Sequence, residues 1–465
     1  MKGEKRFAVL LLAAILVLQL AMHASLAKSI FFNDEGHFLA FTWLTTKGLV
    51  IYRDFFDNHP PLIELVAAVP VALLGANIVV ARSLSALAQI ATTAVVFLFA
   101  RKLYGDKAAV AAALFYAGFE ILFFGFWFVI EPFLALSLAV SAFSLAEWDE
   151  KGGWRSLALC GVVAGLSLLL KPQAVVFAAA AAFLVWRRSG MKEAAKLAAW
   201  AALPVAAVAA YFAANGALYE FVYYSAFASL LGSQGFAKLW LTPYEVAVLA
   251  LAMAAAAAFA VLAARKGMKR AELITCAWFA TALLFAFPRL DLFHFIPALA
   301  ALAVMFGRAI GEHMGKRRQS ARSPLPLAFL FVAIVFFAAF ITSFAFGDTT
   351  AADRAIGAYF AARVPPDRTM VAYTFKPQIY VYADRLPASY YISLPQWFID
   401  EKAEARIIAD LESNRPEYAY LADAEFDRGE TMADFAPRIY AYLRGHYETV
   451  QYFPDGSEAL RRKAG

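Results

Sequence analysis

Eleven long apolar runs, each separated from the next by a short polar segment, dominate this sequence. They begin near residues 7, 81, 107, 131, 156, 172, 195, 243, 271, 292 and 325. A helix that crosses a bilayer needs about 20 mostly apolar residues, and these runs reach or approach that length. Only 17% of the residues are charged, against roughly 25% in soluble proteins. We therefore predict a mainly α-helical, polytopic membrane bundle of eleven spans.

Basic clusters alternate with basic-poor segments between these runs. Lys2, Lys5 and Arg6 precede the first run, and later clusters follow the second, fourth, sixth, eighth and tenth runs. Membrane proteins carry such an excess of Lys and Arg in their cytoplasmic loops. The N-terminus is therefore expected in the cytoplasm, and eleven spans place the C-terminal tail on the periplasmic or extracellular side. This arrangement of the net charge of +6 is typical of membrane loops and does not indicate a nucleic-acid partner.

Two apolar segments need a separate interpretation. Residues 60–75 are short, begin with a Pro pair and contain Glu64, so we expect an interfacial or re-entrant helix that does not cross. The first run is interpreted as an uncleaved span. The alternative is a signal peptide cleaved after Ala27, which would leave the sidedness unchanged.

The tail differs in character from the rest of the chain. We predict a transmembrane domain over residues 1–346, with a first outer loop at 27–80, and a small exterior α/β domain over 347–465. In the tail, the pattern predicts helices over 350–363, 395–412 and 431–443, and strands over 369–375, 378–384, 416–423 and 446–453.

The first outer loop places ionisable residues beside an apolar helix face. Asn33 is a good N-cap, Asp34 and Glu35 fall in the first turn, and His37 lies three residues beyond Asp34 on roughly the same face. This arrangement holds two carboxylates and an imidazole at the membrane surface. The alternative interpretation is that the acids only favour the positive end of the helix.

Further ionisable residues recur at the expected outer ends of the spans: His59, Arg82, Glu131, Lys171, Arg289 and His294. Ionisable groups near membrane depth are costly unless paired or hydrated, which makes them functional candidates. For each of them, a snorkelling anchor or a helix cap is the alternative. Glu120, inside the third run, is expected to face the bundle interior and is assigned no role.

An acidic pair with basic residues on one membrane face suits a lipid-phosphate-linked sugar donor. The acceptor hydroxyl needs a carboxylate base, and the departing lipid phosphate needs fixed cations. Attack opposite the phosphate would invert the anomeric carbon. The alternatives are a flippase or other transporter of lipid-linked sugars, and a ligase or polymerase of lipid-linked oligosaccharides. We find no internal repeat of the kind that many transporters show.

The motifs NDEGHFLAF, GLVIYRDFFDNHPPL and GANIVVARSLSAL, followed by EPFLALSLA, LLLKPQAVVF and DLFHFIPALAAL, resemble a known family in their order. They resemble the bacterial family 39-like integral-membrane glycosyltransferases of the C-type superfamily. That family is related to protein O-mannosyltransferases and to the aminoarabinose transferase that modifies lipid A. The resemblance covers nearly the whole chain and implies a bacterial inner-membrane enzyme.

The resemblance also implies roles for individual residues. Asp34 is the first choice for the catalytic base, Glu35 the alternate, and Glu131 the second acidic position. The donor is a polyprenyl-phosphate monosaccharide, and the acceptor is a glycan, a lipid or a protein. The candidates for binding the donor phosphate are Lys171, Arg82, His59, His294 and Arg289.

The chain departs from the family at one candidate position. His59 stands where the aminoarabinose transferases carry a phosphate-associated Lys, which argues against that sugar. Some members bind a divalent metal, for which Asp34 and His37 are the candidate ligands, although this sequence requires no cofactor.

Overall fold

A computed structural model of the chain describes residues 2–228, 268–286, 291–316, 347–373, 376–394, 398–422 and 430–464, with isolated positions between 246 and 261. The expected spans that begin near residues 243 and 325 lie outside the described residues, as does Arg289. The chain forms two compact units. Unit 1 comprises Met1–Ala27, Arg82–Tyr211 and Phe236–Phe346, and unit 2 comprises Lys28–Ala81, Phe212–Gly235 and Gly347–Gly465.

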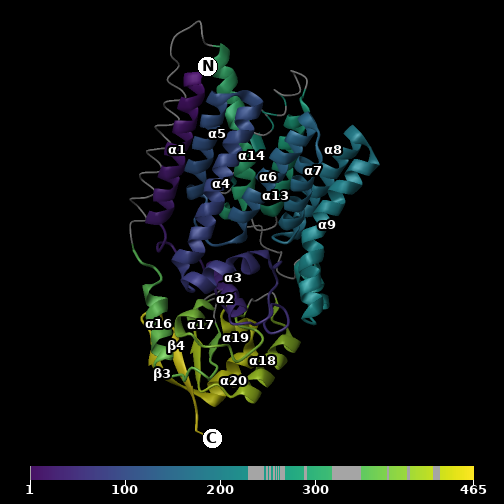
Figure 1. Ribbon diagram of the computed structural model, residues 1–465. Helices are drawn as coiled ribbons and strands as arrows, with labels where there is room; N and C mark the ends of the chain where they lie inside the picture. Colours follow the sequence, from purple (N-terminus) through teal and green to yellow (C-terminus); the bar gives the residue numbers. More distant parts are fainter. Residues whose placement is uncertain are drawn as a thin grey trace. The chain divides into compact units, whose positions relative to one another are not determined.

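Unit 1 is a bundle of long apolar helices that run alongside one another (Figure 1). Its described helices are α1 (Lys2–Ser25), α4 (Ile78–Tyr104), α5 (Asp106–Leu122), α6 (Ile130–Lys151), α7 (Trp154–Leu168), α8 (Val175–Ser189), α9 (Met191–Ala214), α13 (Arg270–Ala286) and α14 (Ile296–Lys316). The short 3₁₀ turns η1 (Pro172–Ala174) and η3 (Leu292–Phe295) precede α8 and α14. These helices coincide with nine of the eleven predicted runs, the other two lying outside the described residues.

Length and composition qualify five stretches within the described residues as membrane spans: Arg6–Ser25, Ile78–Tyr104, Ile130–Lys151, Met191–Ala214 and Leu292–Gly311. The helices α5, α7, α8 and α13 are shorter, at 15 to 17 residues. The prediction of a polytopic helical membrane protein is confirmed.

Small residues allow the helices of unit 1 to pack closely. A Cβ atom on Gly165 of α7 would lie 2.1 Å from the carbonyl oxygen of Ala201 in α9, and Gly161 meets α9 one turn away. On α14, a Cβ on Gly307 would lie 2.5 Å from the carbonyl oxygen of Ala108 in α5. Gly161 and Gly165 on α7, and Gly307 and Gly311 on α14, are each four residues apart. This is the small-xxx-small spacing that brings membrane helices together.

Unit 2 contains the first outer loop and the tail. The loop forms α2 (Asn33–Thr46) and α3 (Leu62–Leu74), and residues after α9 form α10 (Leu218–Val222) and the π-helical turn η2 (Tyr223–Ala228). Because α3 has only 13 residues, it is too short to span a bilayer. Its exposed Val66, Val69 and Leu73 give it an apolar outer face, which suits an interfacial helix.

The tail folds around a four-stranded mixed sheet (Figure 1). Its strands β1 (Val371–Tyr373), β2 (Tyr418–Leu421), β3 (Tyr447–Tyr452) and β4 (Glu458–Arg462) are arranged in the order β1-β2-β4-β3. The pair β1–β2 is parallel and the others are antiparallel. Helices α16 (Ala351–Ala361), α17 (Gln378–Ala383), α18 (Glu401–Asn414), α19 (Met432–Phe435) and α20 (Pro437–His446) complete it.

The predicted strand over 378–384 is wrong, because this segment is α17. Pro377, with φ −64°, stands at its N-cap and favours a helical start. Its side chains are buried on almost every face, so the apolar pattern alone does not distinguish helix from strand. Strand β4 was not predicted. It follows a turn at Gly456, where φ is +82°.

Candidate functional site

Three predicted site residues meet in unit 1, although they come from three separate spans. Glu131 lies in the first turn of α6, Lys171 immediately precedes Pro172 at the start of η1, and His294 lies in η3. All three stand where a helix begins, at the same end of the bundle. We call Glu131, Lys171 and His294 the Glu131 cluster.

The Glu131 cluster is organised around one carboxylate oxygen. Oε1 of Glu131 lies 2.6 Å from Nζ of Lys171 and 2.7 Å from Nδ1 of His294. The Lys171 ammonium group donates to this oxygen, and His294 does so in the tautomer that carries its proton on Nδ1. Nε2 of His294 is then left as an acceptor, 3.9 Å from a carboxylate oxygen of Asp291.

The side chains of the Glu131 cluster are largely buried, which is unusual for ionisable residues of a membrane helix. The Glu131 side chain is only 3% exposed, while those of Lys171 and His294 retain 16% and 17% exposure. A buried charge of this kind persists only with a partner. The arrangement therefore holds the ammonium group of Lys171 at a fixed position while leaving it partly open, which suits the binding of a phosphate group.

Arg82 has a different environment. Its Nη1 donates to the carbonyl oxygen of Leu26 at 2.7 Å, and its guanidinium lies 5.3 Å from the centre of the Phe126 ring. The side chain is buried. These contacts tie the start of α4 to the end of α1.

In unit 2, the acidic pair sits on the first turn of α2 as predicted, but with different partners. The N-cap is Phe32 and not Asn33, and its backbone N–H donates to Oε2 of Glu35 at 3.1 Å. Glu35 is fully buried, whereas Asp34 is only half-buried and lies at the start of the helix. Of the two carboxylates, Asp34 is therefore the better placed to meet a substrate.

His37, one of the two candidate metal ligands, is held by hydrogen bonds within unit 2. Its Nε2 lies 2.8 Å from Oγ of Ser393, and the ring is also hydrogen-bonded to the backbone of Asn33. Burial lowers the pKa of His37 to about 3, with the nearby His59 adding to the effect. Within the described residues, no group of three or more His, Cys, Asp or Glu side chains is arranged to hold a metal ion.

His59 is hydrogen-bonded to the carboxyl group of Asp57, also in the first outer loop. Oδ1 of Asp57 accepts from both the backbone N–H and Nδ1 of His59, each at 2.9 Å. Glu64 of α3 is fully buried, and no described residue makes a hydrogen bond to its carboxyl oxygens. Burial and the neighbouring Asp57 raise the pKa of Glu64 well above its ordinary value.

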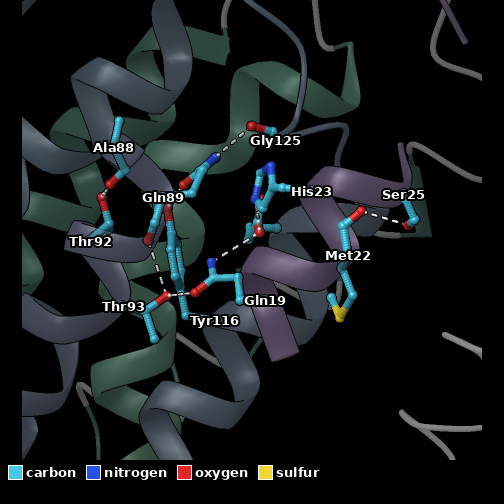
Figure 2. A network of polar contacts seen from close by, with 11 residues as sticks. Gln19, Met22, His23, Ser25, Ala88, Gln89, Thr92, Thr93, Tyr116 and Gly125 are labelled. Carbon is cyan, nitrogen blue, oxygen red and sulfur yellow. Dashed lines mark hydrogen bonds and ion pairs between the residues drawn. The ribbon is translucent and has the colours of Figure 1, made fainter. Parts of the chain in front are cut away.

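Figure 2 shows a buried polar network in unit 1 to which the sequence analysis assigned no function. Oε1 of Glu120 on α5 accepts from Nε2 of Gln19 at 3.0 Å and lies 2.9 Å from Nε2 of His23, both on α1. On α4, Thr93 donates to Gln19, while Gln89 accepts from Tyr116 and donates to the carbonyl oxygen of Gly125. Glu120 does face the bundle interior, as expected. The signal in the sequence was the polar pair Gln19 and His23 inside an otherwise apolar run.

A family model matches part of this chain. Residues 58–213 match the family described as dolichyl-phosphate-mannose-protein mannosyltransferase. This range contains His59, Arg82, Glu131 and Lys171. No curated protein matches the chain.

Solved structures resemble the chain over almost its whole length. ArnT from Cupriavidus metallidurans bound to undecaprenyl phosphate has a TM-score of 0.66 at 13% identity, covering 98% of both chains. The apo state of the same protein gives 0.64 at 14% identity, covering 97% of both chains. The archaeal oligosaccharyltransferase AglB from Archaeoglobus fulgidus, in complex with an inhibitory peptide and a dolichol-phosphate, gives 0.59 at 12% identity, covering 97% of this chain and 74% of that one. These likenesses establish the fold, a helical membrane bundle with a small C-terminal mixed sheet.

Proposed function

We propose that this chain is a membrane glycosyltransferase that uses a polyprenyl-phosphate-linked sugar donor, because residues 58–213 match the family described as dolichyl-phosphate-mannose-protein mannosyltransferase. The chain transfers one monosaccharide from a polyprenyl-phosphate donor to a hydroxyl group of a glycan, lipid or protein acceptor at the outer face of the membrane. The anomeric carbon is inverted in the transfer.

The Glu131 cluster is the observation that carries this proposal. It holds the ammonium group of Lys171 at the end of a membrane bundle, where that group stays partly exposed. A donor phosphate needs this kind of fixed positive charge, because negative charge builds on it as the sugar leaves. The undecaprenyl phosphate in the ArnT structure supports a polyprenyl phosphate as the leaving group.

The chemical step needs a base as well as a cation. In this proposal, the acceptor oxygen forms a bond to the anomeric carbon while the bond from that carbon to the phosphate oxygen breaks. The acceptor proton passes to the carboxylate of Asp34, and the lipid phosphate departs with the bonding electrons. Glu35 is the weaker candidate for the base, because its buried carboxylate already caps α2. Attack on the face opposite the phosphate inverts the anomeric carbon.

The proposed sidedness follows from the basic residues of unit 1. Arg101 and Lys102 end α4, Lys151 ends α6, and Arg187 and Arg188 lie in the last turn of α8. Glu131 and Lys171 lie at the opposite ends of α6 and α8. Because cytoplasmic loops are enriched in Lys and Arg, we place the Glu131 cluster and the C-terminal tail on the outer side, and the N-terminus in the cytoplasm.

Transfer of radiolabelled sugar from a panel of polyprenyl-phosphate monosaccharides tests this function in membranes that contain the full chain. The wild type is expected to label a glycan, lipid or protein fraction, and Asp34→Asn to lose about 10²-fold or more of that activity. The matched control is Asp384→Asn, because Asp384 is an exposed carboxylate of the same unit in a left-handed conformation that Asn tolerates. Near wild-type activity of Asp34→Asn would refute the assigned base.

Lys171 has its own test. Lys171→Gln is expected to raise the KM for the donor about tenfold or more and to leave the KM for the acceptor nearly unchanged. Lys196→Gln, at an exposed lysine of α9, is the control. Equal changes for the two substrates would contradict a phosphate role.

If the wild type moved sugar-lipid across vesicle membranes without transferring sugar, the function would be that of a flippase. If it accepted only diphosphate-linked oligosaccharides, it would be that of a ligase or polymerase.

A further inference from the structure

A groove opens in unit 1 at the end of α6 and α8 that lies away from the Glu131 cluster. It has a volume of about 220 Å³ and is lined by residues of α6, α8 and α13. Leu145, Phe183, Leu184, Leu273 and Ile274 form its apolar wall. Asp149, Arg187 and Arg270 lie along the same groove. It therefore combines a hydrocarbon surface with a charged rim.

The charge of this rim is positive. Asp149 pairs with Arg188 at 3.0 Å and with Arg270 at 3.3 Å, so one carboxylate is shared by two guanidinium groups. Arg187 is exposed and has no carboxylate partner among the described residues. The lining residues Arg187, Arg270 and Asp149 carry a net charge of +1, and the adjacent Arg188 raises it to +2.

The apolar wall is open to the side of the bundle. Phe183, Trp186 and Leu273 are exposed large apolar side chains. Phe183 and Trp186 also pack edge to face, with ring centres 5.8 Å apart. On a helix that crosses a bilayer, such a surface faces lipid chains, and Trp is enriched where the chains meet the head groups. A water-soluble anion would gain nothing from this wall.

We propose that the groove is a binding site for one anionic phospholipid, with the phosphate against Arg187 and Arg270 and one acyl chain along Leu184 and Leu273. By the proposed sidedness this site lies in the cytoplasmic leaflet. Anionic lipids are attracted to basic pockets between membrane helices, and each Arg or Lys near the surface strengthens the attraction several-fold. This inference goes beyond the proposed transfer reaction, which it neither uses nor changes.

The site is separate from the proposed donor site. Arg187 lies about 18 Å along α8 from Val175, at a rise of 1.5 Å per residue, and Lys171 lies before that helix begins. On α6, Asp149 is about 27 Å from Glu131 by the same measure. A phosphate held by Arg187 and Arg270 is therefore far from one held by Lys171.

Native mass spectrometry of the purified full chain tests the proposal with dioleoyl phosphatidylglycerol and dioleoyl phosphatidylcholine as the probes. The wild type is expected to retain one phosphatidylglycerol in preference to phosphatidylcholine. The double variant Arg187→Gln, Arg270→Gln is expected to bind phosphatidylglycerol about 30-fold more weakly. Arg155→Gln is the matched control. Arg155 is an exposed arginine at the start of α7, on the same side of the bundle but outside the groove, and its loss should change binding by less than about twofold.

A second variant tests the apolar wall without changing any charge. Leu273→Trp fills the groove and is expected to weaken phosphatidylglycerol binding, whereas Leu284→Trp, at an exposed position of the same helix outside the groove, leaves it unchanged. Equal affinities for the two lipids would overturn the proposal, as would equal losses in the double variant and Arg155→Gln. It would also be overturned if Lys171→Gln alone abolished phosphatidylglycerol binding, or if undecaprenyl phosphate displaced the lipid from the wild type.

Discussion

Helices α6 and α8 carry an ion pair at each end, and the two pairs differ mainly in burial. At one end, Glu131 of α6 binds Lys171, just before α8, and shares the same oxygen with His294. At the other end, Asp149 of α6 binds Arg188 of α8 and is shared with Arg270. The Glu131 side chain is 3% exposed and that of Asp149 is 20% exposed, while Arg270 reaches 53%.

Burial decides what each carboxylate does. Water screens the Asp149 group, so its ion pairs contribute little to stability and its arginines remain available to an outside anion. The Glu131 group lies largely out of water, so each partner depends on the others for its charge. One acid between two bases therefore gives a rigid cluster with an oriented ammonium group at one end. At the other end it gives a more exposed group with an excess of positive charge.

Glu131→Gln is expected to have the largest effect. Removing the carboxylate charge leaves Lys171 buried without its partner, which costs about 3–5 kcal/mol of folding free energy and disrupts the proposed donor site. Thermal unfolding of the purified protein and sugar transfer in membranes measure the two effects. Glu131→Asp keeps the charge and is expected to retain part of both. A melting temperature for Glu131→Gln equal to that of Asp149→Asn would break the comparison between the two ends.

The buried network around Glu120 provides a test of tight polar packing within the same bundle. A Cβ atom on Gly125 would lie 2.0 Å from Oε2 of Glu120 and 2.4 Å from Nε2 of Gln89. Gly125→Ala is therefore expected to destabilise unit 1 by about 1–3 kcal/mol through overpacking. Gly118→Ala, on α5, is the matched control because nothing lies within 4 Å of its added Cβ. Equal melting temperatures for the two variants would show that the network accommodates the added methyl group without loss of stability.

His37 extends the comparison to unit 2, where burial depresses the pKa of an imidazole to about 3. The unfolded chain binds a proton at His37 below about pH 6.5, while the folded chain does so only near pH 3. Stability from this residue is therefore full above pH 6.5 and falls as the pH drops toward 3, by about 2 kcal/mol at pH 5. Thermal unfolding between pH 5 and pH 8 measures this loss.

The control is His37→Gln, which keeps a polar side chain that can reach Ser393 but does not titrate. Its unfolding curve is expected to be flatter over this pH range than that of the wild type. An identical slope in the two proteins would assign the acid sensitivity to other groups.

The comparison also shows what the sequence can and cannot predict. Glu131-Pro132 and Lys171-Pro172 were recognisable as helix starts on one side of the membrane, because proline marks the first turn and the basic clusters mark the other side. Hydropathy gives the depth of a residue but not which way it faces around a helix, so the sharing of one Glu131 oxygen by Lys171 and His294 was not predictable. The capping of α2 by Glu35 was not predicted either, since it depends on whether the helix starts at Phe32 or Asn33.

Asp149→Asn is expected to have the smallest effect on the fold and to sharpen the contrast between the two ends. Because its pairs with Arg188 and Arg270 are partly exposed, losing them costs at most about 1 kcal/mol and leaves sugar transfer unchanged. The net charge at the groove mouth rises by one, so phosphatidylglycerol is expected to bind several-fold more tightly. High salt should reduce that gain, since the charges lie near water. Weaker lipid binding in Asp149→Asn would instead mean that the carboxylate is needed to hold the two arginines in place.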